Sequence, residues 1–98
     1  MKQLFAVTRA RGPAWEDTKP LEGQAEWSAH AAFMDALAAE RFVLLAGPLE
    51  GFREALIIIR AGSTEEIDTR LAADPWTKRE LLRTTRIAPW TLRLGSLE

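Results

Sequence analysis

Apolar side chains gather in four short runs along this chain and on one side of an alanine-rich stretch. The runs are rich in β-branched and large apolar residues, which is typical of strands, and they are Leu4–Thr8, Phe42–Ala46, Ala55–Ile59 and Ile87–Leu94. The first three are apolar at consecutive positions, whereas the last alternates apolar with polar residues. Pro89 cannot donate a backbone hydrogen bond, so it places this last strand at the edge of a sheet.

Two helices and a short helical turn are predicted between these strands. The stretch Gln24–Glu40 repeats its apolar residues with helical spacing. A capping box at Ser63–Glu66 opens a second helix, which extends to about Ala73. The pair Asp74-Pro75 then starts a third helical turn, because a proline in the first helical position loses no hydrogen bond. The glycines and prolines of Arg9–Gly23 indicate a long loop.

The predicted order of elements is strand, helix, strand, strand, helix, strand. Right-handed crossovers turn this order into the ferredoxin-like βαββαβ fold of the α+β class, an antiparallel sheet with its helices on one face. The chain has the length of a single domain, residues 1–98. Because the first three strands are apolar on both faces and two helices cover only one, we expect a second copy to cover the other face in a homodimer.

Composition and charge narrow the classes of function. A formal net charge of −1 argues against a nucleic-acid partner, because proteins that bind nucleic acids carry a basic excess. The chain has no cysteine, which excludes disulfides and thiolate metal sites, and one histidine cannot build a histidine-rich site. We therefore expect no metal and no cofactor. The first apolar run ends at Thr8, too short for a signal peptide or a membrane span, so we expect a cytoplasmic protein.

His30 is the single histidine of the chain, and its position on the predicted helix is informative. At about 100° per residue, four apolar side chains lie within roughly 60° of it: Trp27, Phe33, Met34 and Leu37. The imidazole therefore points to the apolar side of the helix. A side chain that titrates near neutrality at such a position has either a hydrogen-bond partner or a chemical function. His30 thus marks a small reactive or ligand-binding cleft.

Four short motifs follow one another over most of residues 1–95. They are Gln24-x-x-Trp27-x-x-His30-x-x-Phe33-Met34-x-x-Leu37, Leu45-Ala46-Gly47-Pro48-Leu49, Asp74-Pro75-Trp76 and Pro89-Trp90-Thr91-Leu92. Each motif alone is unspecific. In this order and at this spacing, the four together resemble the YCII-related (YciI-like) domain family.

This resemblance implies a fold that agrees with the one predicted from the pattern. The family fold is the dimeric ferredoxin-like α/β barrel. Its suspected active site consists of a histidine on the first helix and an aspartate after the second helix, which correspond here to His30 and Asp74. One branch of the family resembles muconolactone isomerases and removes chloride from a chlorinated hydroxyquinone ring. The chain departs from the family at Arg41, where relatives often carry a glycine that ends the first helix in a left-handed cap.

The two suspected catalytic residues also have ordinary structural interpretations. An imidazole held by a carboxylate has a fixed tautomer and serves proton transfer, but a core histidine bonded to Glu26, one turn earlier, also fits the sequence. Asp74 orients His30 in the first interpretation and simply caps the third helical turn in the second. Both roles of Asp74 are compatible, because a cap uses one carboxylate oxygen and leaves the other.

Tryptophans and arginines supply the candidate substrate-binding residues. Trp27 and Trp76 neighbour the suspected site residues and are expected to wall an apolar cleft for a flat ring, although core packing is their ordinary role. Trp15, in the long loop, is a candidate lid. Arg9 and Arg11, at the end of the first strand, are candidates for holding a carboxylate of the substrate.

Two functions of different classes follow from these observations. The first is a small YciI-like enzyme of lyase or isomerase type, which uses His30 and Asp74 for acid–base chemistry on a small organic acid or an aromatic-derived substrate. The second is a non-catalytic dimeric domain that binds a small metabolite or a protein partner, with His30 tied to Glu26. The two differ in whether the His30 ring opens into a solvent-connected pocket with Asp74 in reach.

Overall fold

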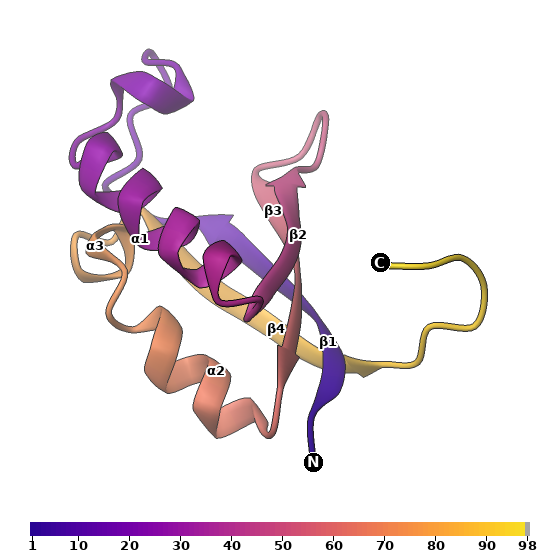
Figure 1. Ribbon diagram of the computed structural model, residues 1–98. Coiled ribbons are helices and arrows are strands. Elements are labelled where there is room, and N and C mark those ends of the chain that lie inside the picture. The colour runs from indigo at the N-terminus through magenta and orange to yellow at the C-terminus, as the bar shows by residue number, and fades with distance from the viewer. Residues whose placement is uncertain (98) are drawn as a thin grey trace.

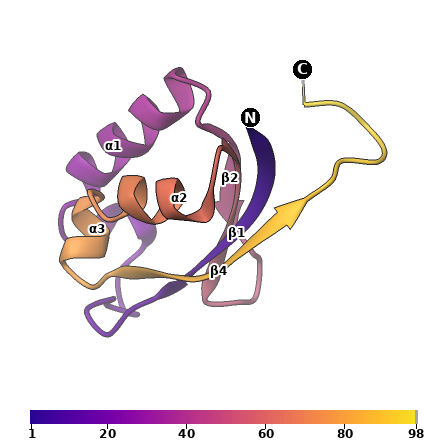
Figure 2. The ribbon, with the colours of Figure 1, turned by 90° about the horizontal axis from the view of Figure 1, so that it is seen from below.

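The computed structural model describes residues 1–97 and contains one antiparallel sheet with three α-helices against one of its faces (Figure 1). The elements follow in the order β1 (Gln3–Arg11), η1 (Leu21–Gly23), α1 (Trp27–Ala39), β2 (Val43–Pro48), β3 (Glu54–Ala61), α2 (Thr64–Leu71), α3 (Pro75–Lys78) and β4 (Leu82–Trp90). The sheet order is β2-β3-β1-β4, and each neighbouring pair is antiparallel. Figure 2 shows the helices together on one side of the strands. The predicted α+β class and ferredoxin-like βαββαβ arrangement are confirmed.

The first and last strands differ from their predicted bounds for a common reason. β1 continues past Thr8 because Arg9, although charged, takes the next inward position of the strand and is buried there. The long loop therefore begins only at Gly12. The added residues of β1 pair with Leu82–Thr84, so β4 starts earlier than the predicted strand Ile87–Leu94. β4 also ends earlier, at Trp90, because Trp90 pairs with Leu4 near the beginning of β1. The edge position predicted from Pro89 is confirmed, because β4 is the last strand of the sheet.

Helix α1 begins at Trp27 and not at Gln24, the predicted start. The amide of Gln24 is buried and satisfies backbone groups of the preceding loop. Its oxygen accepts from the N–H of Glu16 at 3.0 Å, and its nitrogen donates to the carbonyls of Glu16 and Lys19 at 2.8 and 3.0 Å. Glu26 then has a left-handed φ of 61°, which is incompatible with the interior of a right-handed α-helix. The loop therefore includes positions 24–26.

The two helix caps predicted from the sequence are present. The hydroxyl of Ser63 accepts from the N–H of Glu66 at 3.1 Å, and the Glu66 carboxylate accepts from the N–H of Gly62 at 2.7 Å. The carboxylate of Asp74 accepts from the N–H of Trp76 at 2.9 Å, with proline in the first helical position. Asp74 is thereby held at the start of α3, facing α1.

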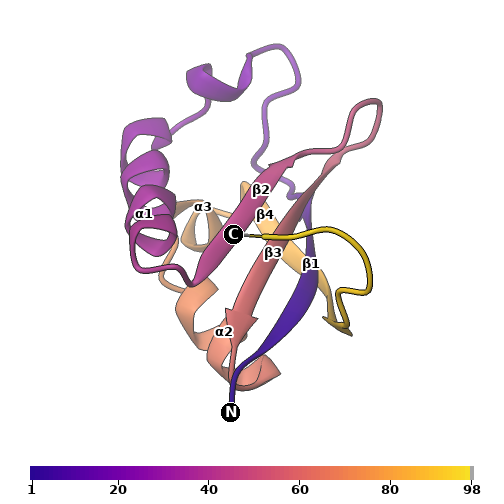
Figure 3. The same ribbon diagram turned by 45° about the vertical axis from the view of Figure 1, so that its right-hand side comes forward.

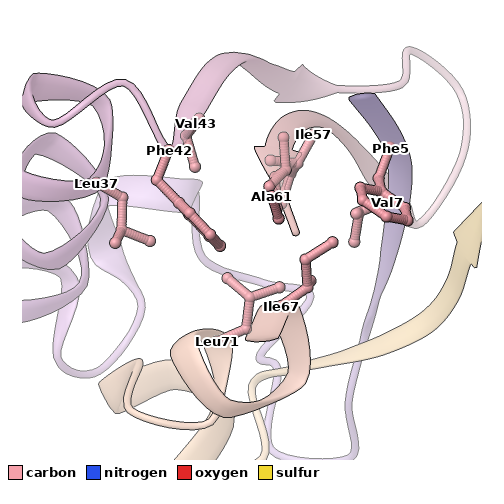
Figure 4. Close-up of a cluster of buried hydrophobic side chains, with 10 residues drawn as sticks. Phe5, Val7, Leu37, Phe42, Val43, Ile57, Ala61, Ile67 and Leu71 are labelled. Carbon is pink, nitrogen blue, oxygen red and sulfur yellow. The ribbon is translucent and has the colours of Figure 1, made fainter. Parts of the chain in front are cut away.

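The main hydrophobic core lies between the sheet and helices α1 and α2 (Figure 4). It combines the inward residues of β1 and β3 with apolar residues of the helices and of the segment that enters β2: Phe5, Val7, Leu37, Phe42, Val43, Ile57, Ile59, Ala61, Ile67 and Leu71. A second, smaller cluster of Trp15, Trp76, Leu81 and Leu82 lies around α3. The site described below lies at the junction of these two clusters.

The opposite face of the sheet carries no helix within residues 1–97 (Figure 3). The strand register places Leu4, Ala6, Ile58 and Leu45 on this open face. Leu45 is 55% exposed. The segment after β4 leaves the sheet on this side, as Figures 1 and 3 show. None of the described helices has the length and apolar content that crossing a membrane requires.

Candidate functional site

His30 and Asp74 are in direct contact. The Nδ1 atom of His30 lies 2.9 Å from Oδ1 and 3.0 Å from Oδ2 of Asp74. The two residues are far apart in the sequence, and the packing of α3 against α1 brings them together. Because an ionised carboxylate only accepts hydrogen bonds, Nδ1 carries the proton, and in the neutral ring Nε2 is left as an acceptor.

The carboxylate of Asp74 is fully buried and receives donors from three sides. Besides His30, the N–H of Trp76 donates to Oδ1 and the guanidinium of Arg9 to Oδ2, each at 2.9 Å. Burial alone raises the pKa of the Asp74 carboxyl, but the hydrogen bonds from His30 and Trp76 and the charge of Arg9 outweigh it and bring the pKa below its usual value. Asp74 therefore stays ionised near neutral pH.

Arg9 approaches Asp74 from the sheet. Its Nη1 donates to Asp74, and its Nη2 donates to the hydroxyl of Thr77, which in turn donates to the carbonyl of Leu71 at 2.8 Å. Burial lowers the pKa of Arg9 from its usual value, although the charge of Asp74 opposes this, and the guanidinium remains protonated. Its Nε is buried without a partner among residues 1–97. Arg9 and Asp74 thus form a buried ion pair behind the histidine.

The imidazole of His30 lies flat on a tryptophan. Its ring centroid is 3.8 Å from that of Trp76, and the two planes differ by 6°. Trp76 is itself buried, donates its indole N–H to the carbonyl of Ala25 at 2.6 Å, and meets Trp15 edge-on at 5.4 Å. Trp27 is tilted against both His30 and Trp76, with centroids 6.1 and 5.8 Å away. These aromatic contacts restrict the imidazole to one orientation.

A cavity of about 470 Å³ opens beside His30, between α1 and the ends of β1, β2 and β3. Most of its lining is apolar, and the residues that line it include Trp15, Trp27, Ala31, Met34, Ala46, Pro48, Ala55, Ile57 and Trp76. The side chain of His30 keeps 12% of its surface exposed, and its Nε2 has no hydrogen-bond partner within residues 1–97. No group of three or more His, Cys, Asp or Glu side chains in this part of the chain is arranged to hold a metal ion.

The structure brings all five predicted site residues together: His30, Asp74, Trp27, Trp76 and Arg9. The alternative bond from His30 to the Glu26 carboxylate is absent, since that carboxylate pairs with Arg79 at 3.2 Å. The catalytic and substrate-binding roles of the five residues stay predictions.

Two residues that organise the site were not predicted to belong to it, although Gln24 begins the first of the four motifs. Thr77 binds Arg9, and Gln24 organises the loop that carries Trp15. A signal existed for the environment of Arg9, because Phe5, Val7 and Arg9 share the alternation of one strand face. That alternation predicts a buried guanidinium. A buried guanidinium in turn requires an acidic partner.

The comparisons with known proteins bear on the fold. No family model matches this chain, and no curated protein matches it. Among solved structures, the chain is similar to 5-chloro-2-hydroxyhydroquinone dehydrochlorinase (TftG) from Burkholderia phenoliruptrix AC1100, in its complex with 2,5-dihydroxybenzoquinone. The sequence identity is 22% and the TM-score 0.65, and the match covers 95% of this chain and 96% of the other. The likeness extends over the whole ferredoxin-like fold.

Proposed function

We propose that this chain is a small YciI-like enzyme that uses His30 as a general acid–base on a small aromatic-derived or organic acid substrate. One observation carries the proposal: His30 binds Asp74 through Nδ1, while the same ring lines an apolar cavity. A histidine bound to a carboxylate at one nitrogen and open to a cavity at the other is suited to moving a proton.

The chemistry follows from the hydrogen bonds. In the resting state the neutral imidazole offers the lone pair of Nε2 to a substrate C–H or O–H in the cavity. When Nε2 takes the proton, the ring becomes a cation, and the ionised Asp74 stabilises it through the bond to Nδ1–H. The imidazolium then returns the proton to another atom of the substrate, which isomerises it, or protonates a leaving group, which completes an elimination.

Each of the other predicted site residues has a role in this proposal. For Arg9 we propose a role other than the predicted one of holding the substrate. Its terminal nitrogens bind Asp74 and Thr77, so it keeps Asp74 ionised and in place and acts on the substrate only through that carboxylate. Trp76 fixes the plane of the imidazole, and Trp27 forms part of the cavity wall beside it. The largely apolar cavity suits a flat ring, and the similar structure TftG holds a dihydroxybenzoquinone. We therefore propose an aromatic-derived ring as the substrate.

The test compares wild type with His30→Gln, using 5-chloro-2-hydroxyhydroquinone for chloride release and small aromatic-derived acids in deuterated water for proton exchange. We expect wild type to turn over at least one of these compounds, and the variant to be slower by a factor of about 10²–10⁴. Glu26→Gln is the matched control, because it removes the alternative partner of His30 without touching Asp74. Equal rates for wild type and His30→Gln, or binding without turnover by wild type, would favour the non-catalytic binding domain.

We also propose that the chain works as a homodimer, joined through the open face of the sheet. Besides the aliphatic residues described above, this face carries Leu56 and Trp90, which are 37% and 38% exposed. Large apolar side chains exposed together on one face of a sheet are typical of a protein–protein interface. A second copy, packed sheet to sheet, covers it and gives the dimeric α/β barrel.

Light scattering tests the dimer. At micromolar concentration we expect twice the chain mass for wild type, and a monomer for Leu56→Glu, which places a charge on this face. Phe52→Glu is the matched control, since Phe52 is 67% exposed in the turn between β2 and β3, outside the strands. A monomeric wild type refutes the dimer.

A further inference from the structure

We infer that Arg11 is the anchor for a negatively charged group on the ligand, so that the cavity selects planar organic anions over neutral rings of the same shape. This inference deepens the proposed function, because it concerns the same cavity and names the charge of its ligand. It rests on three features of Arg11: its face of the sheet, its contact with Trp15 and its lack of a carboxylate partner.

The alternation of β1 sets the direction of the Arg11 side chain. Phe5, Val7 and Arg9 are buried on the helix side of the sheet, and Arg11 is the next residue on that side. It lines the cavity together with His30. Both groups therefore face the same cavity, one from the sheet and the other from α1.

The guanidinium of Arg11 is held in place without being neutralised. Its Cζ lies 4.6 Å from the ring centroid of Trp15, a cation–π contact that restricts the long side chain and leaves its edge N–H groups free. Within residues 1–97, no carboxylate lies within ion-pair distance of it. Trp15 meets Trp76 edge-on, and Trp76 stacks on His30, so a continuous aromatic wall connects the cation to the imidazole.

The other charged residues around the cavity do not take this role. Arg9 already uses both terminal nitrogens on Asp74 and Thr77. Glu54 pairs with Ala10 in the register of β1 and β3, which directs its side chain to the open face of the sheet. Asp35 lines the cavity from α1, but its side chain is exposed to solvent, which screens its charge. Arg11 is thus the cation available to a ligand.

The chemistry of the site indicates what it binds. A guanidinium with free edge N–H groups forms paired hydrogen bonds with a carboxylate or with the oxyanions of a hydroxylated ring. The apolar walls suit the ring itself, and the size of the cavity fits a compound of one or two rings. The expected ligand is an aromatic or quinonoid ring that carries an anionic oxygen group, with its reacting atom directed to His30.

The experiment measures binding of benzoate and of its neutral counterpart benzamide by NMR, using the imidazole signal of the single histidine. We expect wild type to bind benzoate about tenfold more tightly than benzamide, and Arg11→Gln to lose this preference while it retains benzamide binding. Arg53→Gln is the matched control. Its backbone carbonyl accepts from the Arg11 N–H, but its side chain pairs with Asp17 on the surface, so the preference should persist.

Three results overturn the inference: equal binding of the two compounds by wild type, binding of neither at millimolar concentration, or an unchanged preference in Arg11→Gln. The same titration, followed by the tryptophan fluorescence of His30→Gln, separates this inference from the proposed function. If His30→Gln still binds benzoate more tightly than benzamide, the role of Arg11 is supported whether or not His30 is catalytic. If His30→Gln binds the two compounds equally, the result counts against Arg11 and leaves the proposed catalytic role of His30 untouched.

Discussion

Asp74→Asn is the substitution that tests the buried centre of the site. The sequence suggests a mild change, because asparagine caps a helix about as well as aspartate. The structure predicts a severe one. The amide has no charge to balance the guanidinium of Arg9, which is 1% exposed and remains protonated. Its NH₂ group also cannot accept the hydrogen bonds that one of the carboxylate oxygens accepts.

The magnitude follows from the burial of both charges. Removing one partner of a buried ion pair costs about 3–5 kcal/mol, because the remaining charge stays in a medium that solvates it poorly. A domain of this length has an unfolding free energy of roughly 5–15 kcal/mol, so Asp74→Asn removes a large part of it. Replacing both residues, as in Arg9→Met with Asp74→Asn, removes the unbalanced charge and should recover part of the loss.

Urea unfolding followed by tryptophan fluorescence measures these free energies. Asp17→Asn is the matched control, because it breaks an ion pair with Arg53 in which both side chains are more than half exposed, and such pairs contribute about 0–1 kcal/mol. A loss for Asp74→Asn as small as that of the control, or a double variant less stable than the single one, would refute the reasoning about the buried charge.

Three further predictions concern pH and backbone. The pKa of Asp74 is lower in the folded chain than in the unfolded one, so its stabilising contribution is present above the unfolded value, about pH 4, and is lost as the pH falls through the folded value. The unfolding free energies of wild type and Asp74→Asn should therefore approach each other as the pH falls through the folded pKa of Asp74. A difference that stays constant with pH would contradict this. Arg41→Gly should stabilise the chain by about 1 kcal/mol in urea unfolding, because Arg41 has a left-handed φ of 66° after α1, which is strained for any residue with a Cβ. Arg41→Ala keeps the Cβ and should give no such gain. Gly12→Ala should destabilise the chain by about 1–3 kcal/mol, because the added Cβ would lie 2.2 Å from the carbonyl oxygen of Glu80. Gly47→Ala is the control, because the space around Gly47 is open. Equal losses of stability in the two variants would contradict the clash.

Local patterns in the sequence determine most of the fold. Short apolar runs predict β2 and β3, and the run of β3 is also rich in β-branched residues. The Ser63 cap predicts the start of α2, and the order of elements leaves few ways to connect them. These signals are local because a strand face, a helix face and a cap each involve residues within one or two turns of the chain.

The site is different, because its bonds join residues that are 44 and 65 positions apart in the sequence. The sequence determined that His30 points inward and that Asp74 caps a helix. Only the tertiary structure decided that these residues meet, and that Arg9 neutralises Asp74 while Arg11 stays free. The end of β1 was also predicted too early, because Arg9 and Arg11 are charged and charged residues are more common in loops than inside a sheet. A local pattern records which face a side chain takes, whereas its partner across the core depends on how the layers pack.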